Sequence, residues 1–185
     1  MASQNQIQPW LRLSVPAGNT LQLGGLLGAA GMVLAGRRRA SHRGSLLVLG
    51  WLLAYFTGHA FSHWAVGRLG GIRFTGYGLH GSTAVAGYPP GMRAIFAHLP
   101  FLSARTEPVT RRAASPTARA AMYAAGPAAT ILTSIGIPII GERAGVPGAR
   151  RLRLGASLWI TGMLAGELFA PHSDLRRAWR ELRQT

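Results

Sequence analysis

The chain contains no cysteine and no lysine, and only five of its 185 residues are acidic. The absence of cysteine excludes disulfide bonds and thiolate metal sites. All twenty basic residues are therefore arginine, and the formal net charge is +15. The first eight residues carry no charge, and no small-residue cleavage site follows a basic start. We therefore do not expect a cleaved secretory signal at this end.

A charge of +15 in a soluble protein would indicate nucleic acid as a partner. Here, however, the arginines mostly flank apolar runs, as they do where membrane proteins meet anionic lipid headgroups. The expected partner is therefore a lipid bilayer with anionic headgroups, and no nucleic acid. Such a membrane protein could also bind other membrane-protein subunits or a substrate transmembrane helix.

Several apolar stretches suit a bilayer, since about 20 apolar residues in a helix span its ~30 Å hydrocarbon core. The sequence predicts an all-α membrane protein with about four transmembrane helices in a single domain, 1–185. The expected spans are 17–36, 45–66, 119–141 and 154–170.

The remaining segments are expected near the membrane surface. Residues 1–16 are predicted to be interfacial. The Gly- and Pro-rich loop 67–117 is predicted to form a short hairpin or a re-entrant segment. Residues 175–183 are predicted to form a basic interfacial helix, with Trp179 and Leu182 facing inward.

Two histidines, His59 and His63, lie near the end of the second expected span. A spacing of four places both imidazoles on one face of a helix, one turn apart, where they could bind one metal ion. They could also bond to neighbouring helices or ligate a tetrapyrrole. In zinc proteases the residue after the first histidine is a glutamate that activates the metal-bound water, whereas this chain has Ala60. The loop histidines His80 and His98 are expected to be solvated.

Three stretches occur in an order that resembles the site-2 protease family of intramembrane zinc metalloproteases, which are peptidase M50-like. They are His59-Ala-Phe-Ser-His63, Ala125-Gly126-Pro127 and Pro171-His-Ser-Asp174, and the resemblance covers roughly residues 45 to 183. It implies that His59, His63 and Asp174 bind Zn²⁺, with a fourth position open to water. His172 is a possible additional ligand, which would close the site.

The chain departs from the pattern of that family at three positions. Ala60 replaces the general-base glutamate, Thr130 replaces an asparagine, and Leu175 replaces a glycine. Glu167 is the only other carboxylate in an expected span and is the remaining candidate base. The resemblance therefore implies a catalytically weak or inactive homologue that acts as a binding or structural membrane subunit. The alternative is an active intramembrane zinc metalloprotease that cleaves a transmembrane substrate helix.

The expected location is a bacterial inner membrane. Four spans would place the two termini and loop 67–117 on one side. Twelve arginines lie on that side and eight lie in the two short loops, so charge alone does not set the orientation. The family places the end of the histidine helix near the cytosolic face, which favours a cytoplasmic location for the termini and the loop.

Overall fold

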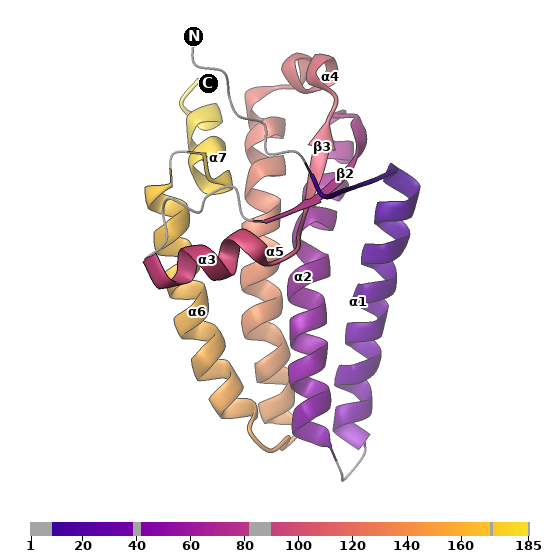
Figure 1. The fold of residues 1–185 in the computed structure, drawn as a ribbon, viewed down its shortest axis with the longest axis vertical. Coiled ribbons are helices and arrows are strands. Elements are labelled where there is room, and N and C mark those ends of the chain that lie inside the picture. Colours follow the sequence, from indigo (N-terminus) through magenta and orange to yellow (C-terminus); the bar gives the residue numbers. More distant parts are fainter. Residues whose placement is uncertain (1–8, 39–41, 82–89, 171, 185) are drawn as a thin grey trace.

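The structure is a computed structural model that describes residues 9–38, 42–81, 90–170 and 172–184. Four long helices run side by side in Figure 1 and account for most of the molecule. They are α1 (Val15–Arg38), α2 (Arg43–Leu69), α5 (Pro116–Arg143) and α6 (Ala149–Phe169). The expected spans 17–36, 45–66 and 119–141 lie within the first three of these helices, and 154–170 extends one residue past the end of α6.

Two of the long helices, α2 and α5, are long and apolar enough to cross a membrane by length and composition. The helix α1 carries Asn19 and Gln22 in its first half, and α6 begins with an arginine-rich turn, which makes both of them more polar. The expectation of four spans therefore stays a prediction.

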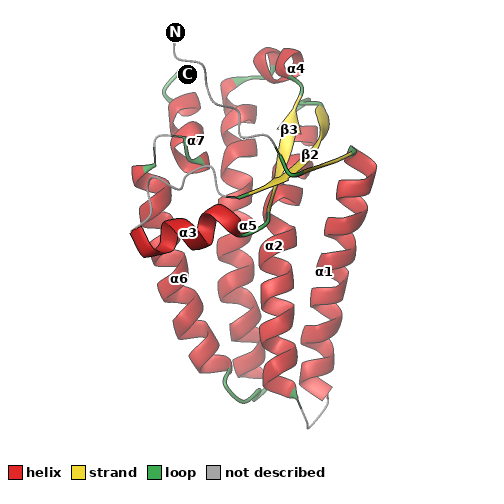
Figure 2. Ribbon diagram, viewed as in Figure 1, coloured by secondary structure: helices red, strands yellow, loops and turns green. Residues whose placement is uncertain are grey.

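A small antiparallel sheet, drawn in yellow in Figure 2, accompanies the helices. Its strand order is β1-β2-β3. The strands are β1 (Leu11–Leu13), β2 (Phe74–His80) and β3 (Phe101–Thr106), and α3 (Pro90–His98) lies between β2 and β3 in the sequence. Strand β2 lies in the loop 67–117, where a short hairpin was expected, but its partner β3 follows α3, so the two strands do not form a short hairpin. The strand β1 lies in a segment expected to be only interfacial, so the fold is not purely helical.

The sheet is fixed to the bundle by Tyr77, whose side chain is fully buried. Its ring lies against Gly18 of α1, where a Cβ atom would overlap it, and its hydroxyl donates to Asn19 Oδ1 at 2.5 Å. Burial raises the pKa of Tyr77 to about 12, so the hydroxyl stays protonated and remains a donor. Gly76 has a φ of +145° and passes so close to the Leu13 carbonyl that no side chain would fit.

Two short helices complete the end of the bundle that carries the sheet, as seen at the top of Figure 1. They are α4 (Pro108–Ala113) and α7 (Asp174–Leu182). The side of α7 that packs against the protein carries the buried Ala178. Trp179 and Leu182, which were expected to face inward, are 57% and 46% exposed, so neither side chain is part of the protein core.

The docking of α7 on α5 includes an ion pair. Arg119 Nε lies 2.7 Å from Glu181 Oε2, and both side chains are largely buried. The helix α5 begins at a favourable boundary, since Ser115 caps it by accepting from Ala118 N and Pro116 occupies its first turn. This end of α5 therefore provides a fixed surface on which α7 lies.

Candidate metal centre

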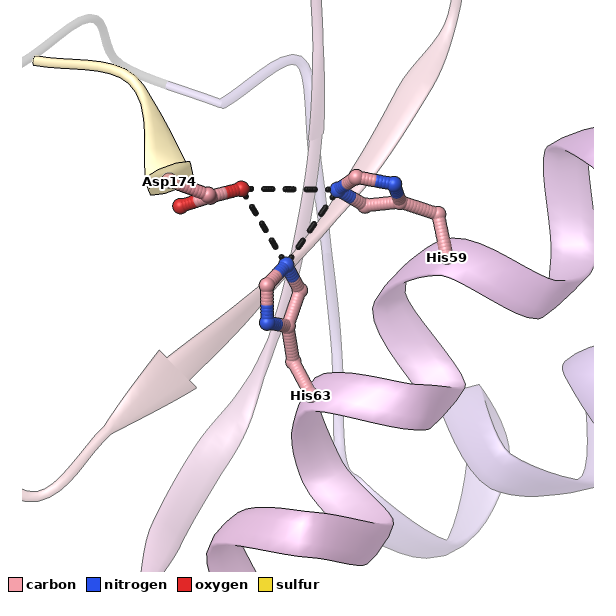
Figure 3. Close-up of side chains that lie close together, drawn as sticks. All are labelled: His59, His63 and Asp174. Carbon is pink, nitrogen blue, oxygen red and sulfur yellow. Dashed lines mark hydrogen bonds and ion pairs between the residues drawn. The ribbon is translucent and has the colours of Figure 1, made fainter. Parts of the chain in front are cut away.

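The two histidines of α2 and the first residue of α7 bring three ligand atoms together, as Figure 3 shows. Nε2 of His59 and Nε2 of His63 are 3.2 Å apart. Asp174 Oδ2 lies 3.4 Å from the first nitrogen and 3.1 Å from the second. Tetrahedral ligands at ~2.0–2.1 Å from a zinc ion are about 3.3–3.4 Å apart. The three residues thus lie close enough to bind one ion, as predicted.

The other ring nitrogen of each histidine has an oxygen partner on α5. His63 Nδ1 donates to the carbonyl of Met122 at 2.6 Å, and a carbonyl can only accept. His59 Nδ1 lies 2.9 Å from Thr130 Oγ1, whose own proton points to the Gly126 carbonyl at 3.1 Å. Both rings are therefore protonated at Nδ1, which leaves the Nε2 lone pairs facing Asp174.

Asp174 supplies the negative charge of the cluster. Burial alone would raise the pKa of its carboxyl, but hydrogen bonds from His59 and His63, which need a proton on Nε2 and so apply when no metal ion is bound, outweigh that effect and hold the pKa well below its usual range. Two nitrogen lone pairs and an ionised carboxylate at these distances repel one another unless a proton or a metal ion lies between them. Two neutral imidazoles and one carboxylate are an ordinary ligand set for Zn²⁺, so these residues fit that ion.

Gly126 provides the space that the two imidazoles occupy. A Cβ atom at this position would lie 2.7 Å from His59 Nε2 and even closer to His63 Nε2. Because α5 packs against α2 here, any larger residue would displace a ring. This gives the Ala125-Gly126-Pro127 stretch a physical role that the sequence alone did not indicate.

Thr130 also has a role that the sequence analysis missed. It was interpreted only as the replacement of an asparagine, but its buried hydroxyl orients His59. A hydroxyl one helical turn after a glycine is a weak signal, because the contact depends on how α5 packs against α2. The carbonyl of Met122 has no sequence signal at all.

A cavity of about 390 Å³ surrounds the three ligands. Its wall includes Glu167, whose Oε2 accepts from the backbone N–H of Leu175 at 3.2 Å. This bond holds the carboxylate at the first turn of α7, directly beside the ligand Asp174. Ala60 is buried, and its methyl group is not part of the cavity wall.

The remaining histidines have different surroundings. His172 lies in the cavity wall, but its side chain is exposed and stands outside the cluster formed by the three ligands. His80, which was expected to be solvated, also lines the cavity and bonds to Ser103 Oγ at 2.7 Å. His98 is exposed and bonds to the Ala94 carbonyl at 2.8 Å.

The start of α7 explains how Asp174 reaches the histidines. Ser173 caps the helix by accepting from Arg176 N, and its hydroxyl donates to the carbonyl of Glu167 at the end of α6. The chain is thereby turned so that the first residue of α7 points at α2.

No family model, curated protein or solved structure matches the chain.

Proposed function

We propose that the chain is a membrane metalloprotein of the site-2 protease type, in which His59, His63 and Asp174 hold one Zn²⁺. The observation that carries this proposal is the convergence of three ligand atoms within 3.4 Å of one another. The hydrogen bonds at both Nδ1 atoms add to it, because they keep each Nε2 free to coordinate. The apolar character of α2, which carries both histidines, supports a site within the membrane.

In this proposal the protein is catalytically weak or inactive and serves as a binding or structural subunit of a membrane complex. A bound zinc ion would supply Lewis-acid activation of a water or a carbonyl. Position 60 offers no general base, and loss of such a base lowers the rate typically ~10²–10⁴-fold. Thr130 directs its hydroxyl proton to Gly126 and accepts from His59, so it cannot replace an asparagine amide in holding a substrate.

The geometry favours a single metal ion over a tetrapyrrole. A flat macrocycle needs one imidazole standing alone on its axis. Here a second imidazole and a carboxylate lie within 3.4 Å of the His59 nitrogen. These neighbours occupy the space in which the ring of a tetrapyrrole would have to lie.

The metal content of the purified full-length protein tests the proposal. We expect about one zinc per chain, lost in His63→Ala and in Asp174→Ala. The matched control is His98→Ala, since His98 is an exposed histidine that bonds to a backbone carbonyl and lies outside the three-residue cluster. Equal zinc content in all four proteins would contradict the assignment.

A second candidate function is active intramembrane proteolysis with Glu167 as the base. The observation that favours it is that Glu167 lines the same cavity as the ligands and is held beside Asp174 by the Leu175 N–H. Incubation with a helical membrane substrate distinguishes the two functions. If the protein is an active protease, it should cleave the substrate, and Glu167→Gln should lose this cleavage while its zinc content stays constant. If the protein is a catalytically inactive subunit, the zinc-loaded protein should not cleave the substrate.

A further inference from the structure

Arg177 is a cavity-lining cation that has no ion-pair partner in the described part of the chain. On α7 it lies one turn after Asp174 and one turn before Glu181, where helical neighbours could pair with it. Neither does, because Asp174 contacts the two imidazoles and Glu181 is bound to Arg119. The guanidinium thus has no carboxylate in direct contact, although it lies beside the candidate metal centre.

The position of Arg177 is fixed by an aromatic ring. Its guanidinium carbon lies 5.7 Å from the centroid of the Tyr123 ring, which also lines the cavity. An arginine held over an aromatic face keeps its N–H donors in the plane of the guanidinium, where they can bind a carboxylate. The side chain is only partly exposed, so an ion pair formed there would be partly shielded from water.

The rest of the cavity combines a second cation with an apolar wall. Arg111 of α4 lines it, and Glu107, one turn earlier, forms no ion pair with this arginine. Four aromatic rings, from α2, β2 and β3, contribute to the wall, and they belong to Tyr55, Phe56, Phe74 and Phe101. A volume of about 390 Å³ is in the range of small-molecule sites, which are mostly apolar with a few placed polar groups.

The charges of the cavity set the sign of its ligand. The carboxylates of Asp174 and Glu167 balance the two arginines that line it. A divalent ion at the metal centre therefore leaves the cavity with a surplus of two positive charges, counted with neutral histidines. Such a cavity attracts an anion and disfavours a cation.

We infer that this cavity binds a carboxylate attached to an apolar chain, with the carboxylate paired to Arg177 and the chain lying against the aromatic wall. The inference rests on the proposed function, since the bound metal ion supplies the surplus charge. The carboxylate could come from a free fatty acid or from the C-terminus of an apolar peptide. Both present the same chemistry to Arg177.

Photolabelling tests this inference on the full-length protein in lipid nanodiscs. The probe is decanoic acid bearing a diazirine, and the labelled residues are mapped by mass spectrometry. Two pairs of unlabelled compounds compete with the probe. Decanoate is compared with decanol, and an apolar tripeptide with a free C-terminal carboxylate is compared with the same tripeptide as its C-terminal amide. We expect adducts on the cavity wall and competition at least about ten-fold stronger by an acid than by its neutral counterpart, since hydrogen bonds to a charged group are strong. The acid that competes identifies the source.

Two variants locate the effect. Arg177→Gln should reduce the labelling about ten-fold or more, whereas Arg180→Gln on the exposed side of the same helix should not. Zinc content is measured on every sample, so loss of the metal centre is seen separately. Acid-selective labelling of a protein that carries no metal would support the carboxylate site while refuting the proposed metal function. Equal competition by acid and neutral compounds in zinc-loaded protein would overturn the inference.

Discussion

Replacing Thr130 with valine should weaken metal binding although the residue touches no metal ligand atom. Valine has nearly the same shape but no hydroxyl, so His59 Nδ1 loses the acceptor that lies 2.9 Å away. The imidazole is then free to rotate or to move its proton to Nε2, and a protonated Nε2 cannot coordinate. Loss of such an orienting partner typically weakens metal affinity about 10–100-fold, or roughly 1.4–2.7 kcal/mol.

The assay is a competition titration of the purified protein with a chromophoric zinc chelator. Thr130→Ser keeps the hydroxyl and should bind like the parent protein. Thr133→Val is the matched control, because Thr133 lies on the same helix and bonds only to backbone carbonyls of α5. The absorption spectrum of Co²⁺-loaded protein adds a readout of ligand geometry that a general loss of stability would not reproduce. Zinc affinity unchanged in Thr130→Val would refute the role assigned to the hydroxyl.

Three further predictions concern the site and the topology. Gly126→Ala should abolish stoichiometric zinc binding, because the added Cβ would overlap both imidazoles. Gly136→Ala, on the same helix, should retain zinc, because its added Cβ meets no atom within 4 Å. Normal zinc binding by both variants would contradict the packing argument. Ala60→Glu alone should not create a good protease, because Thr130 still lacks the amide of the asparagine and catalytic groups act as a unit; robust cleavage of a helical membrane substrate by this variant would show otherwise. Reporter fusions at the two ends of the chain should lie on the same side of the membrane, the cytoplasmic one, and opposite sides would exclude four spans.

Much of the candidate metal centre could be predicted because it follows from local spacing. Two histidines four residues apart share a helix face in any helix, so the pair His59 and His63 needed no knowledge of the fold. Asp174 was placed by resemblance alone, since 111 residues separate it from His63. The structure brings it to the histidines through the turn between α6 and α7, which no local pattern predicts.

The features that were missed depend on contacts between distant elements. Thr130 and the Met122 carbonyl act on the histidines only because α5 packs against α2 in one register. The strand β1 has three residues and exists because Leu11 to Leu13 pair with β2. Arg177 is recognisable as a cavity residue only when α7 is docked. The expected helices were easier, since apolar length is a property of each segment by itself.

The placement of the third ligand on a separate short helix couples ion binding to the docking of that helix. If Asp174 can coordinate only while α7 rests on α5, a bound ion stabilises the docked position of α7. This stabilisation grows with the concentration of the free ion and reaches about 2.7 kcal/mol at a hundred times the Kd of the ion. Amide exchange across α7 should therefore slow when zinc is added, and it should not respond in Asp174→Ala. The coupling is reciprocal. A partner that pulls α7 away, breaking the Arg119–Glu181 pair, would release the ion from a site it never touches.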